Sequence, residues 1–109
     1  MKKLFNFTET NRFTKQVVKL FSDDEYAEIQ QFICENPDFG KIIQGSGGIR
    51  KMRCKVDNRG KSGGACLIYY WAVSREKIFL LDLYAKNEKE NLTSGKIKNL
   101  RREVEEFLR

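Results

Sequence analysis

The stretch "GSGGIRKMRCKVDNRGKSGGACLIYYW", residues 45–71, decides the fold expected for this chain. After its opening glycines, basic and apolar residues alternate, reading Lys-Met-Arg-Cys-Lys-Val from Lys51 onward. A period of two is typical of a half-buried β-strand, so this alternation predicts a strand from about Ile49 to Val56. One face of that strand is apolar, and the other presents Lys51, Arg53 and Lys55.

Downstream of this strand, the chain reads as a small antiparallel sheet. Residues 59–64 are expected to form a flexible basic turn, and two apolar runs follow it, Cys66–Ala72 and Lys77–Tyr84. The short segment Ser74-Arg75-Glu76 between these runs is typical of a hairpin loop. We therefore expect two more strands, each paired with its neighbour in sequence.

Helices are expected both before and after these strands in the sequence. Residues 3–8 alternate weakly and predict a first strand, and apolar residues from Phe13 to Phe21 then recur at helical spacing. Ser22-Asp23-Asp24-Glu25 is a capping box, and the helix that it begins ends at Asn36-Pro37. A glycine-rich loop covers Gly40–Gly48, and Thr93 caps a final amphipathic helix that reaches Leu108.

This order predicts one α+β domain over residues 1–109: a strand, two helices, three strands and a helix. We expect the two N-terminal helices and the C-terminal helix to pack on one face of the small antiparallel sheet. The cations of the strand would then point from the other face.

The positive charge of the chain is concentrated in one segment. The net charge is +6, and residues 41–64 hold seven basic residues against Asp57 alone, so the rest of the chain sums to zero. Such a patch favours an anionic partner, most often nucleic acid or an acidic protein segment. The chain has no histidine, which excludes a ribonuclease that works with two histidines.

No membrane segment, metal site or cofactor motif is indicated. The longest uncharged apolar run is far shorter than a membrane helix, and the N-terminus lacks the core of a signal peptide. Cys34, Cys54 and Cys66 are odd in number and lack zinc-ligand spacing, so they are interpreted as packing residues. We expect a cytoplasmic protein that uses no metal and no cofactor.

Several motifs, taken in order, resemble the RelE/ParE toxin superfamily, and within it the RelE-like HigB-type toxins. The resemblance covers most of the chain. Its carriers are Asp23-Asp24-Glu25-Tyr26, Asn36-Pro37, Gly40, the stretch from Gly45 to Arg53, Gly60-Lys61-Ser62-Gly63-Gly64, Ile68-Tyr69-Tyr70-Trp71, Tyr84-Ala85-Lys86-Asn87-Glu88 and Leu92-Thr93.

The resemblance implies a toxin of a type II toxin–antitoxin pair. RelE-like members enter the ribosomal A site and cut mRNA, which inhibits translation, whereas ParE members share the fold and poison DNA gyrase. The implied partners are the ribosome with its mRNA and a cognate antitoxin, here of the helix-turn-helix HigA type.

The resemblance also suggests how such a chain cleaves RNA without histidine. RelE-like enzymes use Lys, Arg and sometimes Tyr on the sheet face, and the family's basic pair falls on Lys51 and Arg53. A lysine crowded by other cations has a lowered pKa and can act as a base, whereas an arginine keeps its charge and grips phosphate. Lys51 is therefore the candidate base, Arg53 is the phosphate clamp, and Lys86 matches the family's basic position after the last strand.

The remaining cations and two tyrosines are candidates for RNA binding. Tyr84 or Tyr69 is expected to stack on a base. Backbone phosphates of mRNA or ribosomal RNA are expected to contact Arg50, Lys55, Arg59 and Lys61.

Two departures from the family leave alternatives open. Cys66 stands where RelE-like toxins usually carry an arginine, and no tyrosine or histidine follows the last strand. The general acid is therefore unassigned: Lys86, Arg50 or a ribosomal group supplies it, or the protein is a catalytically inactive RNA-binding relative. A ParE-like gyrase inhibitor is the other alternative.

Overall fold

The structure is a computed structural model that describes residues 5–55, 64–85 and 92–109. Its elements follow the expected order, with one short extra strand before the central sheet and a single 3₁₀ turn in the last hairpin. They are β1 (Asn6–Glu9), α1 (Asn11–Leu20), α2 (Asp23–Glu35), β2 (Lys41–Ile42), β3 (Ile49–Cys54), β4 (Ala65–Ala72), the 3₁₀ turn Val73–Arg75, β5 (Lys77–Ala85) and α3 (Ser94–Leu108).

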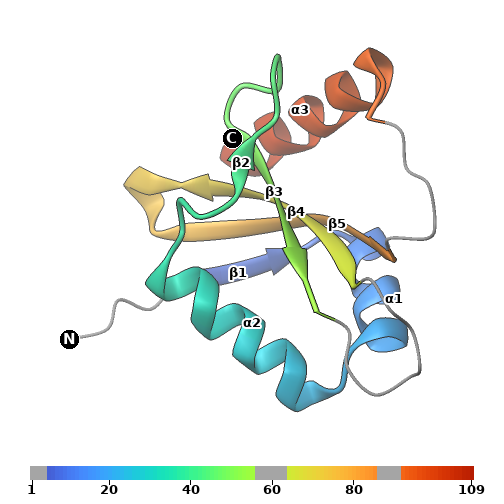
Figure 1. The fold of residues 1–109 in the computed structure, drawn as a ribbon. Coiled ribbons are helices and arrows are strands. Elements are labelled where there is room, and N and C mark those ends of the chain that lie inside the picture. Colours follow the sequence, from blue (N-terminus) through green and yellow to red (C-terminus); the bar gives the residue numbers. More distant parts are fainter. Residues whose placement is uncertain (1–4, 56–63, 86–91) are drawn as a thin grey trace.

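The strands form one five-stranded sheet in the order β1-β5-β4-β3-β2 (Figure 1). The pairs β2–β3, β3–β4 and β4–β5 are antiparallel, whereas β1 runs parallel to β5 at the sheet edge. The sheet is therefore mostly antiparallel, as expected. The parallel edge arises because β1 and β5 are far apart in the sequence and no hairpin joins them.

The predicted helix boundaries are confirmed by their caps. At the start of α2, the Glu25 backbone N–H donates to Ser22 Oγ at 3.1 Å, and the Ser22 N–H donates to Glu25 Oε1 at 2.7 Å. The Lys96 N–H donates to Thr93 Oγ1 at 3.2 Å and so begins α3. Within the described ranges, no helix is both long and apolar enough to cross a membrane.

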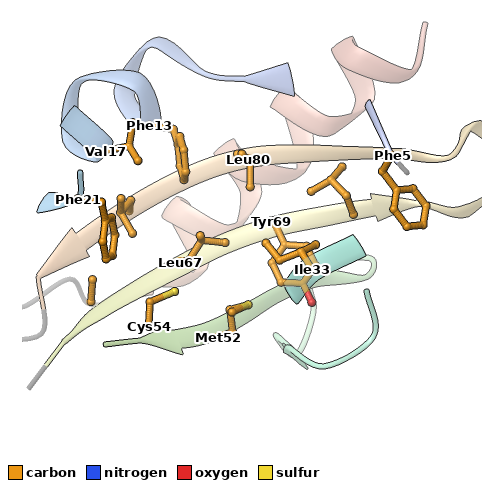
Figure 2. Packing of buried hydrophobic residues seen from close by; sticks show 13 residues of the cluster. Phe5, Phe13, Val17, Phe21, Ile33, Met52, Cys54, Leu67, Tyr69 and Leu80 are labelled. Atoms are coloured by element: carbon orange, nitrogen blue, oxygen red, sulfur yellow. The ribbon is translucent and has the colours of Figure 1, made fainter. Parts of the chain in front are cut away.

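One face of the sheet packs against α1 and α2. Phe13 and Val17 of α1 and Ile33 of α2 are buried in a cluster that includes Leu67 and Leu80 of the central strands (Figure 2). Met52 and Cys54 of β3 extend this cluster toward one side of the sheet. Burial raises the pKa of the Cys54 thiol to about 12, so it stays protonated and serves as a packing residue.

The opposite face of the sheet packs against α3. Leu100 and Val104 of α3 are buried with Ile49, Ile68 and Phe79 in a second cluster. Figure 1 shows α3 on one side of the sheet, with α1 and α2 on the other. The α+β class with three helices against the sheet is confirmed, but the helices do not share one face, as the sequence analysis expected.

The helices cover both faces of the sheet because β4 and β5 present apolar side chains on both faces. Every residue of β5 from Ile78 to Leu83 is buried. A strand that is buried on both faces reads as a continuous apolar run, whereas a strand with one solvated face alternates. The run therefore signals a second covering layer, and α3 supplies it.

A buried tyrosine anchors the segment between α2 and β2. Tyr69 is completely buried, and its hydroxyl donates to the Pro37 carbonyl at 2.8 Å and accepts from the Gly40 N–H at 3.0 Å. A Cβ at position 40 would lie 2.9 Å from the Tyr69 ring, so only glycine allows this approach. The suggestion that Tyr69 stacks on an RNA base is therefore wrong.

Tyr69→Phe is expected to lower the free energy of unfolding by about 2 kcal/mol, because it leaves the half-buried Pro37 carbonyl and the buried Gly40 N–H without their partner. Urea unfolding followed by circular dichroism measures this change. Tyr70→Phe is the matched control. The Tyr70 ring stacks on Phe79, and its hydroxyl forms no hydrogen bond with another described residue. Equal stabilities for the two variants would contradict the anchoring role.

Candidate nucleic-acid interface

The alternation of β3 is confirmed. Met52 and Cys54 are buried, whereas Lys51, Arg53 and the following Lys55 are exposed. Ile49 belongs to the cluster beneath α3, and Lys51 and Arg53 follow it at intervals of two. Lys51 and Arg53 therefore lie on the face of the sheet that carries α3.

Strand pairing places a third cation beside them. Lys41 of β2 is exposed and is the direct Cα partner of Lys51. Among the described residues, no carboxylate forms an ion pair with Lys41, Lys51 or Arg53. We call these three residues the cationic face. Lys41 contributes to the charge of segment 41–64, but its place beside Lys51 was not predicted, because no strand was expected in the glycine-rich loop.

A row of side chains leads from Arg53 across the sheet. Cys66 of β4 is the Cα partner of Arg53, and Tyr84 of β5 is the Cα partner of Cys66, so the three share one face. Tyr84 is half-buried, and its side chain interacts with that of Cys66. Burial, and then the contact with Cys66, raise the pKa of Tyr84, so at neutral pH the phenol can donate a proton or a hydrogen bond but cannot act as a base.

Arg50 lies apart from the cationic face. It is half-buried beside Met52 on the other side of β3, and its Nη1 donates to the carbonyls of Asp38 and Gly40 at 3.0 and 2.8 Å. The guanidinium therefore fastens the segment that leads into β2. The structure does not bring Arg50 together with Lys51 and Arg53, although all three were candidates for one site.

The other predicted cations divide into two groups. Lys55 is exposed and directly follows β3, so it extends the line of Lys51 and Arg53. Three candidates, Arg59, Lys61 and Lys86, lie outside the described residues.

A separate cluster of charges on the α3 side is internally balanced. Asp82 is buried, and its carboxylate lies 3.4 Å from Arg12 Nε and 4.0 Å from Lys96 Nζ. Arg12 also pairs with Glu103 at 2.9 Å, next to a hollow of about 710 Å³ between α1 and α3. Because cations and carboxylates alternate there, this region fixes α3 in place and has far less attraction for an anion than the cationic face.

Comparison with solved structures identifies the fold. A double arginine-to-alanine mutant of the toxin RelE from E. coli, in the free state, superposes with a TM-score of 0.60 at 16% identity, covering 95% of this chain and 98% of that chain. This chain has the RelE-like toxin fold. RelE in the intact E. coli RelBE toxin–antitoxin complex gives 0.58 at 19% identity, over 78% of this chain and 99% of that chain.

An archaeal RelE–RelB complex from Pyrococcus horikoshii is also similar, with a TM-score of 0.53 at 14% identity over 78% of this chain and 98% of that chain. No family model matches the sequence. At these identities the likeness establishes the RelE-like fold, and the surface residues that carry function must be argued from the chain itself.

Proposed function

We propose that this protein is the toxin of a type II toxin–antitoxin pair and that it cuts mRNA on the ribosome. The observation that carries this proposal is the cationic face, where Lys41, Lys51 and Arg53 are exposed without an acidic partner among the described residues. Its setting in a RelE-like fold supports the same function. The protein would act in the cytoplasm, where its substrate is bound to ribosomes.

Cleavage would proceed by attack of a ribose 2′-oxygen on the adjacent phosphorus, which expels the 5′-oxygen of the next nucleotide. Lys51 takes the proton of the 2′-hydroxyl, and Arg53 neutralises the charge that develops on the phosphoryl oxygens. Tyr84 offers an aromatic ring and a protonated phenol at the far end of the row. The departing 5′-oxygen takes its proton from Lys86 or from a ribosomal group, since the guanidinium of Arg50 is bound to main-chain carbonyls.

A ParE-like inhibitor of gyrase is less well supported. An inhibitor that acts by protein contact needs no exposed cluster of cations on the sheet, whereas an RNA phosphate does. Cys66 stands where an arginine is usual in the RelE-like family. Because the row therefore lacks one phosphate-binding charge, we expect a modest rate of mRNA cleavage.

The proposed partner is an antitoxin, as in the RelBE and RelE–RelB complexes with the same fold. A HigB-type toxin with a HigA-type helix-turn-helix antitoxin is the assignment we propose from the sequence motifs. The antitoxin would cover the cationic face or the helices beside it.

Expression of the protein alone is expected to stop growth, and coexpression of the antitoxin encoded beside it is expected to restore growth. Incorporation of labelled methionine should fall before that of labelled thymidine, because translation is blocked first. An earlier fall in thymidine incorporation would indicate gyrase as the target. Unaffected growth with soluble, folded protein would favour the inactive RNA-binding relative.

A further inference from the structure

Two lysines face each other across the edge of the sheet. Lys41 and Lys51 are direct Cα partners in the antiparallel β2–β3 pair, and both are exposed. Two residues further on, the Ile43 N–H donates to the Ile49 carbonyl at 2.8 Å, and both isoleucines are buried beneath α3. Because side chains alternate along a strand, the lysine pair lies on the α3 side, just beyond this buried pair.

The lysine pair is electrostatically unfavourable as it stands. Directly opposite residues in an antiparallel pair have Cβ atoms about 5 Å apart, and like charges at this position destabilise the sheet. Arg12 and Lys96 have the Asp82 carboxylate, but the described residues provide no such partner for Lys41 or Lys51. An anion bound between the two ammonium groups would remove the repulsion.

Side-chain hydrogen bonds on both sides of Lys41 hold the register of the lysine pair. Ser46 Oγ, buried in the turn between β2 and β3, donates to the Ile43 carbonyl at 2.6 Å and accepts from the Ile49 N–H at 3.0 Å. On the other side of Lys41, Arg50 binds the Gly40 carbonyl. The chain is thus fastened on both sides of Lys41, so the lysine pair is a fixed feature of the fold.

We propose that Lys41 and Lys51 together form a binding site for one RNA phosphate, next to the phosphate held by Arg53. This proposal rests on the proposed function and adds a substrate-positioning residue from β2. Arg53 follows Lys51 on the same face at a backbone distance of about 6.6 Å, so the three cations form a short track.

RNA fits this track better than an acidic peptide does. The row from Arg53 through Cys66 ends at the half-buried ring of Tyr84, which offers a surface for an unstacked base. A phosphate backbone with bases on one side satisfies both features, whereas a carboxylate-rich peptide uses only the cations.

The test measures binding of a short single-stranded 2′-O-methyl oligoribonucleotide, which cannot be cleaved, at several salt concentrations. Lys41→Gln should make the slope of log K against log salt less negative by about 0.7, the value of one lost phosphate contact. Lys15→Gln is the matched control, because Lys15 is an exposed lysine on α1, on the opposite face, and its slope should equal that of wild type. Without RNA, Lys41→Gln should raise the Tm at low salt by about 2 °C, since repulsion is relieved.

Equal slopes for Lys41→Gln and Lys15→Gln would overturn the site. If the slopes are equal and the wild-type protein still arrests translation, the proposed function stands and only the phosphate site at the lysine pair is rejected. If the slopes differ but the protein has no effect on translation, the phosphate site stands and the toxin function is rejected. An equal dependence on Lys41 for binding of an oligoglutamate peptide would overturn the assignment to RNA and point to an acidic protein segment.

Discussion

Arg53→Ala is expected to lower the rate of mRNA cleavage on programmed ribosomes about a hundredfold. Removal of one positioned donor to a developing anion raises the activation free energy by about 3 kcal/mol, which corresponds to this factor. Arg53 is exposed and lies outside both apolar clusters, so the loss reflects chemistry rather than folding. Single-turnover assays at saturating toxin measure the rate directly.

The control for this substitution is Arg102→Ala, which removes an exposed arginine on α3. That variant should cleave at the wild-type rate and have the same Tm as Arg53→Ala. Arg53→Lys should fall between wild type and alanine, because a lysine restores the charge but not the two-donor grip of a guanidinium. An unchanged cleavage rate for Arg53→Ala would show that Arg53 takes no part in catalysis.

Lys51→Arg is expected to abolish most cleavage while leaving ribosome binding nearly intact. Arginine keeps the positive charge but cannot give up its proton at any working pH, so it cannot act as a base. The loss should be on the order of a hundredfold or more, within the range for removal of a general base. Ribosome pelleting measures binding, and the appearance of new mRNA ends measures cleavage.

Lys51→Ala separates the two roles of this side chain. If Lys51 is the base, the arginine and alanine variants should both be defective in cleavage, and only alanine should also weaken binding at moderate salt. If Lys51 serves only to neutralise phosphate, Lys51→Arg should cleave normally while Lys51→Ala does not. That second pattern would transfer the role of base to Lys86. Lys15→Ala, which removes an exposed lysine from α1, controls for the loss of charge.

Most of the fold could be predicted from the sequence, because helix caps and strand alternation are strong local signals. The capping residues Ser22 and Thr93 begin α2 and α3 where expected, and the alternation from Lys51 to Lys55 predicted which β3 residues are exposed. Such signals depend on contacts within a few residues, so they are readable without knowledge of the tertiary structure.

The placement of α3 was not readable from its own pattern. An amphipathic helix shows which of its sides is buried, but not which face of a sheet it covers. The apolar run Ile78–Leu81 of β5 held that information, since both faces of the strand needed cover. The consequence for function is direct: the cationic face borders α3, whereas the sequence analysis placed it on an uncovered side.

The composition of the cationic face was predicted only in part. Lys51 and Arg53 follow from periodicity, but Arg50 was grouped with them by proximity in the sequence, and alternation sends its side chain to the other face. Lys41 was missed because β2 has only two residues and its place depends on the Ser46 turn. Tyr69 and Tyr84 have the same residue type, and only burial separates the packing residue from the candidate surface.

The central claim is that the cationic face cuts mRNA on the ribosome, and mapping of mRNA ends tests it most directly. Purified toxin is added to ribosomes that hold a defined codon in the A site, and new 5′ ends are located by primer extension. We predict new ends within that codon for the wild type, none without ribosomes, and about a hundredfold fewer for Arg53→Ala. Intact mRNA with folded wild-type toxin, or equal cleavage by wild type and Arg53→Ala, would contradict the account.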